Sequence, residues 1–341
     1  MNSQNITDVS LRQLKSAVLE LGLKPFAADQ LVSWLYKKKV TSFEDMTNLS
    51  LLARQVLKEN YFIFRPKLVK ICQAKDSTRK FVFQLADDAK IESVLIPATD
   101  ERLTLCISTQ VGCPMGCDFC RTAKMGFKRD LSQGEILAQI LEVQKVCDQE
   151  DQIITNVVFM GMGEPFVNYE AVAGAVEIML SERGMNFSKR RVTISTSGLI
   201  PQLTQFAKDY NVKLAVSLNA TEDKTRSKLM PINKRYPIAD IINFARKYTK
   251  NSRNYVTFEY VLIKDVNDSK EDMQRLSKLL KGIRAKVNLI AFNAFPGSSY
   301  KGPSEKRVLE FHKYLTEQGI QTNIRLSRGQ DILAACGQLA G

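Results

Sequence analysis

Three cysteines within eight residues, Cys113, Cys117 and Cys120, carry the strongest chemical signal in this chain. They are spaced C-x3-C-x2-C in one loop that also contains glycine and proline, and no histidine lies near them. Cysteine thiolates hold iron–sulfur clusters, and three ligands would leave one iron of a [4Fe-4S] cluster open to a chelating small molecule. A structural zinc site completed by Cys106 is the alternative, because C-x2-C is also a zinc spacing.

Histidine chemistry is nearly excluded, because the only histidine, His312, lies in a helical stretch far from the cysteines. Cys72 and Cys147 match no chemical role, and we expect them to be structural. Seven cysteines in a chain that starts Met-Asn-Ser-Gln-Asn, without the pattern of a signal peptide, predict a reducing, cytoplasmic setting. No apolar run approaches the length of a membrane span, so we expect no membrane partner.

The chain is strongly basic, since 49 Lys and Arg against 36 Asp and Glu give a formal net charge of +13 over 341 residues. Such an excess favours a polyanionic partner, nucleic acid before membrane. The alternative is that the excess only keeps the protein soluble. The length allows one large core and a small appended domain.

The elements that must position the cysteines form an α/β pattern, in which short apolar strands alternate with longer amphipathic helices after residue 100. Strands are expected at 103–108, 156–160, 191–196, 213–218, 257–263, 286–292 and 322–326. Helices are expected near 132–147, 169–181, 200–208, 238–250, 270–281 and 304–317. Six strand–helix pairs are too few for a closed eight-stranded barrel, so we expect an open, partial parallel barrel over residues 99–341.

Two smaller parts precede the barrel. Residues 1–70 carry apolar side chains at helical spacing and predict a small helical domain. Its basic corner, Lys37–Lys39 beside Trp34 and Tyr36, suits a nucleic-acid backbone, and a solvated helix end is the alternative. Alternating segments then predict a short antiparallel β extension over residues 71–98.

Unusual polar motifs follow the carboxyl ends of the predicted parallel strands. In parallel α/β folds this rim binds ligands, because loops and helix amino ends converge there. A structural zinc has no reason to face such a rim, so the zinc alternative weakens. The motifs, in strand order, are the cysteine loop, Gly161–Pro165, Ser195–Gly198, Ser217–Asn219 and Asn293.

The cysteine spacing, an aromatic residue before its last cysteine and the Gly-Glu turn one strand later resemble the radical S-adenosylmethionine (SAM) superfamily. Within it, Met160–Pro165, Ser188–Ser195 and the terminal segment Ala335–Gly341 resemble the RlmN/Cfr family. Pro165 and Pro296 favour its RlmN branch, the dual-specificity 23S rRNA and tRNA adenine-C2 methyltransferases, over its Cfr branch, which methylates C8 of adenine.

The resemblance implies a site for SAM. Cys113, Cys117 and Cys120 would hold a [4Fe-4S] cluster whose free iron chelates SAM, and Gly163 with Glu164 would hold its amine. Asn219 departs from the family, which commonly has histidine there, but an amide can still hydrogen-bond. The remaining SAM contacts implied are Ser195, Ser217, Leu218, Asn219 and Asn293.

The resemblance also implies a mechanism that uses two SAM per turnover. Cys336 would take a methyl group from one SAM and become S-methylcysteine, and the radical from a second SAM would activate that methyl group. Glu92 would remove the C2 proton. Cys106 would then attack the Cys336 sulfur, giving a transient disulfide and releasing the methylated base.

The implied partners are 23S rRNA, at an adenine near the peptidyl-transferase centre, and tRNA, at the adenine 3′ of the anticodon. An electron donor such as flavodoxin and a monomeric state are also implied. A non-catalytic, zinc-stabilised RNA-binding protein and a C8 methyltransferase stay open as alternatives. Basic residues expected in loops near the rim, where they would grip RNA, are Lys124, Lys128, Arg129, Lys189, Arg190, Arg191, Lys234 and Arg235.

Overall fold

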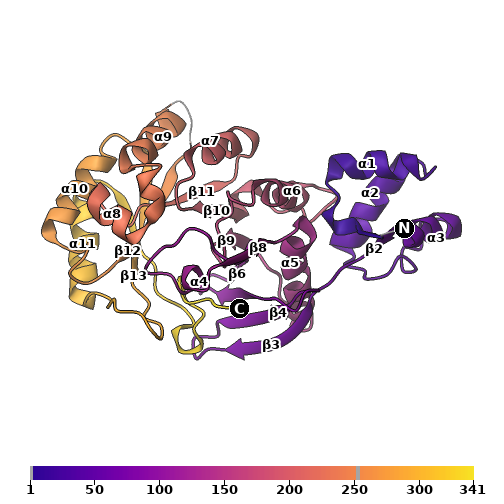
Figure 1. Ribbon diagram of the computed structural model, residues 1–341, viewed down its shortest axis with the longest axis horizontal. Coiled ribbons are helices and arrows are strands. Elements are labelled where there is room, and N and C mark those ends of the chain that lie inside the picture. Colours follow the sequence, from indigo (N-terminus) through magenta and orange to yellow (C-terminus); the bar gives the residue numbers. More distant parts are fainter. Residues whose placement is uncertain (1–2, 251–253) are drawn as a thin grey trace.

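A computed structural model describes residues 3–250 and 254–341, and within these residues ten strands form one sheet. The strand order is β14-β13-β12-β11-β10-β9-β6-β5-β4-β3 (Figure 1). Its two edge strands, β3 and β14, do not pair with each other in the described chain, so the sheet does not close and the predicted open, partial barrel is confirmed. The parallel strands are β6 (Leu103–Cys106), β9 (Asn156–Phe159), β10 (Val192–Thr196), β11 (Lys213–Ser217), β12 (Val256–Leu262), β13 (Ala285–Ala291) and β14 (Gln321–Ile324).

Helices connect the parallel strands, as expected from the amphipathic segments between them. Several begin with a capping box, as at Ser132, whose hydroxyl accepts from the Glu135 N–H while the Glu135 carboxylate accepts from the Ser132 N–H. Such boxes fix where the chain leaves the rim and turns into a helix. The connecting helices are α5 (Gln133–Asp148), α6 (Tyr169–Leu180), α7 (Ile200–Asp209), α8 (Asp223–Leu229), α9 (Ile238–Lys250), α10 (Lys270–Leu280) and α11 (Glu305–Glu317).

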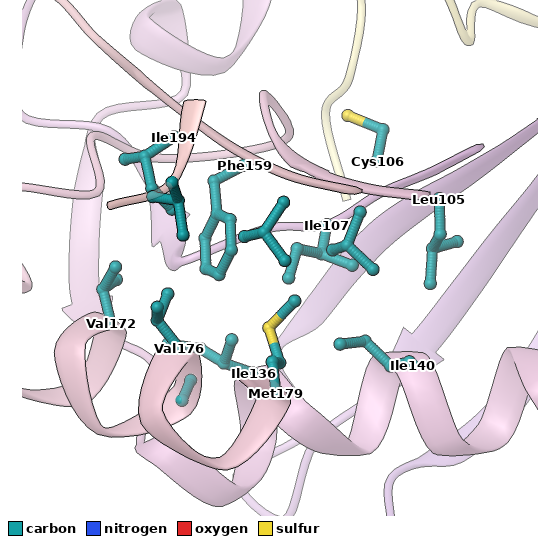
Figure 2. Packing of buried hydrophobic residues seen from close by; sticks show 14 of the residues in the cluster. Leu105, Cys106, Ile107, Ile136, Ile140, Phe159, Val172, Val176, Met179 and Ile194 are labelled. Atoms are coloured by element: carbon teal, nitrogen blue, oxygen red, sulfur yellow. The ribbon is translucent and has the colours of Figure 1, made fainter. Parts of the chain in front are cut away.

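Alternate residues of strand β6 face opposite sides of the sheet. Leu105 and Ile107 point toward helices α5 and α6, on the side where Ile140 and Met179 lie (Figure 2). The Cys106 side chain points the other way, toward the C-terminal segment in the same view. The period-two alternation of a strand thus places this thiol on the inner side of the partial barrel.

The antiparallel extension continues the same sheet. Strand β5 (Lys90–Pro97) pairs with β6, with Val94 opposite Cys106, and it is followed outward by β4 (Arg79–Gln84) and the edge strand β3 (Lys67–Gln73). Residues of β5 therefore lie directly beside the first strand of the barrel, where they can reach its inner side.

The amino-terminal part is helical, with α1 (Leu11–Glu20), α2 (Phe26–Val32), a π-helical turn over Ser33–Lys37, α3 (Leu51–Asn60) and the short strands β1 (Gln4–Asn5) and β2 (Tyr61–Phe62). It lies beyond α5 and α6 at the right of Figure 1. Gln133 Nε2 donates to the carbonyl of Thr7 at 3.0 Å, and the Gly134 N–H donates to Asp8 Oδ1 at 2.8 Å. No helix in the described ranges is long and apolar enough to cross a membrane.

Candidate active site

A cavity opens at the carboxyl ends of the parallel strands. Its walls come from the cysteine loop, the loops after β9, β10 and β11, strands β12 and β13, and the C-terminal segment. The sequence-predicted residues that the structure brings together on these walls are Cys113, Cys117, Cys120, Gly163, Glu164, Ser195, Ser217, Asn219, Asn293 and Cys336.

A small hairpin holds the cysteine loop in place. Strand β7 (Gln110–Gly112) pairs with β8 (Phe127–Asp130), and helix α4 (Arg121–Lys124) begins directly after Cys120. The Cys113 N–H donates to the carbonyl of Gly126 at 3.0 Å. Gly112 has a φ of +76°, and a Cβ there would lie 1.8 Å from the same carbonyl oxygen, so the close crossing of the two strands requires glycine.

The three thiols suit a cationic group. Burial raises the pKa of Cys113 to about 12 and raises those of Cys117 and Cys120, and the neighbouring sulfurs add to the effect. Three thiolates this close and this buried need positive charge, which a bound iron–sulfur cluster provides. No three His, Cys, Asp or Glu side chains in the described part of the chain are arranged to hold a single metal ion. A cubane cluster binds each thiolate through a different iron and does not require that arrangement.

The Gly-Glu turn places a buried carboxylate opposite these sulfurs. Gly163 has a φ of +101°, and a Cβ there would lie 2.6 Å from Gln110 Cβ. Glu164 Oε2 accepts from the Ser197 N–H at 2.7 Å, and Oε1 accepts from the Phe166 N–H at 3.3 Å. Burial raises the pKa of Glu164, and these hydrogen bonds oppose the rise. A carboxylate held this way can pair with a primary ammonium group in the cavity.

The C-terminal segment crosses the cavity and is tied to helix α4. The Arg121 N–H donates to the Gly337 carbonyl at 2.8 Å, and Thr122 Oγ1 donates to the Leu339 carbonyl at 2.7 Å. The yellow C-terminal end lies beside α4 in Figure 1. Cys336 thereby stands next to the cysteine loop, and its sulfur is near enough to Cys120 to raise the pKa of that thiol.

Family models match two parts of this chain, and relatives match its whole length. The radical SAM superfamily model matches residues 107–277, and that of the ribosomal RNA large subunit methyltransferase N-terminal domain matches residues 4–63. The dual-specificity RNA methyltransferase RlmN of Syntrophus aciditrophicus is 46% identical over 341 residues, which cover 100% of this chain and 97% of that relative. This chain belongs to the RlmN family of radical SAM proteins. The predicted resemblance is confirmed.

A second RlmN relative and a solved radical SAM methyltransferase structure agree with this family assignment. The RlmN of Alcanivorax borkumensis is 43% identical, covering 99% of this chain and 90% of that relative. The crystal structure of a radical SAM methyltransferase from Sphaerobacter thermophilus matches with a TM-score of 0.93 and 41% identity, covering 98% of this chain and 99% of that chain. The shared fold therefore includes the amino-terminal helices as well as the partial barrel. Membership of the radical SAM superfamily implies a [4Fe-4S] cluster and SAM.

Two asparagines on the cavity wall already have protein partners. Asn219 accepts from the Val261 N–H at 2.8 Å and has a left-handed φ of +56°. Its amide nitrogen lies 3.2 Å from the sulfur of Met230. Asn293 Nδ2 donates to the carbonyl of Cys336 at 3.1 Å. Both side chains therefore position loops around the cavity, whatever ligand they also touch.

Three sequence-predicted residues lie outside the cavity walls. Leu218 is fully buried, and Cys106 lies beneath the C-terminal segment. Burial and then the nearby Cys336 raise the pKa of Cys106 to about 12, and both thiols are free. Glu92 is buried in an ion pair, because its Oε1 lies 3.0 Å from Lys80 Nζ and its Oε2 accepts from the Ala340 N–H at 3.0 Å. It thus reaches the C-terminal segment.

Sequence reasoning missed Arg226, a fully buried arginine of helix α8. Its Nη2 donates to the carbonyls of Ser197 and Ser217 at 2.7 and 2.9 Å, and its Nε donates to the Leu218 carbonyl at 2.9 Å. Burial lowers the pKa of Arg226 to about 10. It ties the carboxyl ends of β10 and β11 together. Nothing in the sequence distinguishes it from the exposed charges of the same helix.

The prediction that all the basic loop residues lie near the rim is wrong in part. Lys189–Arg191 form a 3₁₀ turn directly before β10, so they lie at the amino end of that strand, on the opposite edge of the sheet. Arg129 is on the rim side but is held by Asp87 and Glu135, with hydrogen bonds of 2.8 to 3.0 Å. Lys124 and Lys128 are exposed beside the cysteine loop.

The basic corner of the helical domain is also partly occupied. Tyr36 is buried, and the Trp34 indole N–H donates to Asn48. Lys39 pairs with Asp148 of helix α5. Lys37 and Lys38 are exposed and Trp34 is partly buried, so this corner offers charge to a partner but not the buried ring of Tyr36.

Proposed function

We propose that this protein methylates C2 of adenine through an S-methylcysteine at Cys336, both in 23S rRNA near the peptidyl-transferase centre and in tRNA just 3′ of the anticodon. The position of Cys336 carries the proposal. Hydrogen bonds from Arg121 and Thr122 fix the C-terminal segment to the helix that starts at the cysteine loop. A thiol that is no cluster ligand therefore stands beside the cluster site. The name that the relatives carry, dual-specificity RNA methyltransferase, agrees.

In this proposal the cavity walls divide between cluster and SAM. Cys113, Cys117 and Cys120 hold the cluster, and Glu164 pairs with the SAM ammonium. When bound, the cluster and two successive SAM molecules supply an electrophilic methyl group and a 5′-deoxyadenosyl radical. The other SAM contacts are Gly163, Ser195, Ser217, Leu218, Asn219 and Asn293.

Cys336 carries the methyl group. Its thiol loses a proton, and the thiolate sulfur bonds to the methyl group as the bond from that carbon to the SAM sulfonium sulfur breaks. Once a hydrogen atom has been removed from this methyl group, its carbon bonds to C2 of adenine and ties the RNA to the protein. Glu92 removes the C2 proton; since Ala340 N–H occupies its Oε2, it does so when the C-terminal segment shifts. The Cys106 thiolate then attacks the Cys336 sulfur, so that an S–S bond forms and the S–C bond breaks with its electron pair left on the carbon, where a proton completes the methyl group of the released base.

The accessory parts complete the proposal. Residues 1–70 form an RNA-binding domain, with Lys37 and Lys38 exposed to the RNA backbone. Residues 71–98 join it to the barrel of residues 99–341. We further propose a cytoplasmic monomer that receives electrons from a donor of the flavodoxin type.

The decisive experiment uses protein with a reconstituted cluster, SAM, dithionite, and either tRNA or a 23S rRNA fragment. We expect 2-methyladenosine by mass and retention of the product nucleoside, with both RNAs as substrates. Formation of 8-methyladenosine would support the Cfr-type alternative. If anaerobically purified protein is colourless, free of iron and carries one zinc, the proposed methyltransferase activity is contradicted and the zinc-stabilised RNA-binding alternative is supported.

Cysteine variants test the individual roles. Cys336→Ala should still cleave SAM but give no methylated RNA, whereas Cys106→Ala should accumulate a covalent protein–RNA adduct. Cys72→Ala is the matched control, because Cys72 lies on the edge strand β3 away from the cavity, and it should behave as wild type. Normal turnover of Cys336→Ala would remove the methyl-carrier role.

A further inference from the structure

Glu259 and Arg325 line the cavity but belong neither to the cysteine loop nor to the polar motifs that follow the strands. Glu259 lies on the inner face of β12, with its side chain 6% exposed. Its Oε1 accepts from Asn288 Nδ2 at 2.9 Å, and its Oε2 has no hydrogen-bond partner in the described chain. Arg325 Nη1 lies 3.8 Å from Oε2, which is an ion pair beyond hydrogen-bond reach.

Arg325 connects this carboxylate to the two thiols. It follows strand β14, and its Nη1 donates to the sulfur of Met160, a weak acceptor, at 3.1 Å. Cys336 first, and then Glu259 and Cys106, raise the pKa of Arg325 against the opposing effect of burial, so its guanidinium lies near both thiols. A strong donor and a strong acceptor thus stand side by side in the cavity that Cys336 also lines.

A buried acceptor without a partner costs free energy unless a ligand donates to it. The ligand must offer a donor next to an acceptor. The Watson–Crick edge of adenine has this pattern, because its N6 amino group donates and its N1 accepts. Guanine presents the reverse, a carbonyl O6 and an N1–H, which would meet the carboxylate and the guanidinium with like groups. C2 is bonded to N1, so a base held this way has C2 beside Arg325, which lies near the Cys336 thiol.

We propose that Glu259 and Arg325 read the target adenine of the RNA, with Glu259 Oε2 accepting from N6 and the Arg325 guanidinium donating to N1. This inference rests on the proposed function and adds the residues that select and orient the base. SAM carries an adenine with the same edge, so the experiment must distinguish the two sources.

The test replaces the target adenine in an RNA substrate by purine, which lacks the N6 amino group, or by 1-deazaadenine, which lacks the N1 acceptor. Purine should lower kcat/KM of the wild type about tenfold, the scale of one lost base contact. For 1-deazaadenine, whose C2 no longer lies between two ring nitrogens, the affinity of cluster-free protein for the RNA should fall about tenfold. Glu259→Gln should lose a similar factor on adenine. In this variant the glutamine amide oxygen accepts from Asn288, as Glu259 Oε1 does. Its NH₂ group then takes the place of Oε2, so a donor stands opposite the N6 amino group, which is also a donor.

The decisive comparison combines each protein variant with the base analogue that lacks its proposed partner atom. On purine RNA, Glu259→Gln should fall within about twofold of wild type, because the contact is already missing. Arg325→Met should behave in the same way in its affinity for 1-deazaadenine RNA. The matched control is Glu310→Gln, an exposed residue of helix α11 paired with Arg307, which should retain the full preference for adenine. Equilibrium binding of the same RNAs to cluster-free wild-type protein should follow the same order.

Two outcomes overturn the inference. In the first outcome, the loss of kcat/KM or affinity caused by the protein variant and the loss caused by its matching base analogue multiply when the two are combined. The protein side chain and the base atom then act independently and do not contact each other. In the second, Glu259→Gln slows RNA-free methyl transfer to Cys336, followed by protein mass, as much as it slows RNA methylation; the pair then reads SAM. If wild-type protein methylates adenine in neither tRNA nor the 23S rRNA fragment, the proposed function fails. Activity of the wild type therefore distinguishes a failure of the proposed function from a failure of this inference.

Discussion

The hydroxyl of Thr122 donates to the main-chain carbonyl of Leu339 at 2.7 Å, joining the helix after the cysteine loop to the segment that carries Cys336. The two residues are 217 positions apart in the chain. The cluster site and the thiol proposed to carry the methyl group are therefore held by direct hydrogen bonds, and the position of one depends on the other.

Thr122→Val should loosen the C-terminal segment without changing the shape of the side chain. One lost hydrogen bond is worth about 1 kcal/mol, which corresponds to a roughly fivefold higher population of the undocked segment. Cys336 should then react about fivefold faster with iodoacetamide, as measured by mass spectrometry. Thr204→Val removes the same type of bond, from Thr204 Oγ1 to the Ile200 carbonyl in α7, and should leave this rate unchanged. Equal rates in all three proteins would contradict the docking role.

Arg226→Met should destabilise the protein strongly. It leaves the carbonyls of Ser197, Ser217 and Leu218 without their buried donor, and each unsatisfied group costs at least about 1 kcal/mol. We expect a loss of about 3 kcal/mol or more in the free energy of unfolding, measured by urea titration. Arg246→Met, at an exposed position of helix α9, should stay within about 0.5 kcal/mol of wild type. A similar result for both variants would show that Arg226 is dispensable.

Local patterns in the sequence were enough to predict the barrel. The alternation of apolar strands and amphipathic helices depends on residues close in the chain, and all seven predicted parallel strands are present in the described structure. The cysteine loop and the Gly-Glu turn were found for the same reason. Both are short motifs, and the rim that unites them follows from strand direction alone.

Contacts between distant segments were not predictable in this way. The ion pair of Glu92 with Lys80 joins adjacent strands of the extension. The residues next to Glu92 and Lys80 in the sequence give no sign of this pairing. Arg226 is similar, because its partners lie on other elements. Lys189–Arg191 were placed on the wrong edge since the basic turn precedes its strand, while the motifs of the site follow theirs.

The reactivity of Cys106 should depend on pH in an unusual range. Burial and the adjacent Cys336 raise its pKa to about 12, so its reactive thiolate is scarce at neutral pH. In cluster-free native protein, alkylation of Cys106 should rise about tenfold per pH unit from pH 7 to 10 without a plateau. Mass spectrometry of the peptide that contains Cys106 measures this rate. A plateau near pH 9 would mean that the thiol has an ordinary pKa.

Gly163→Ala should cost more stability than the same change at a glycine with a similar backbone and open space. Gly163 has a φ of +101°, and its new Cβ would strike Gln110, whose Oε1 holds the Glu164 N–H at 2.8 Å. Gly282 has a φ of +77°, and a Cβ added there would meet no atom of the described chain within 4 Å, so Gly282→Ala isolates the backbone strain. We expect about 1 kcal/mol for Gly282→Ala and at least about 2 kcal/mol for Gly163→Ala in urea unfolding. Equal losses would show that Gln110, whose side chain and main-chain nitrogen both lie within 3 Å of the added Cβ, gives way freely and does not fix the turn that carries Glu164.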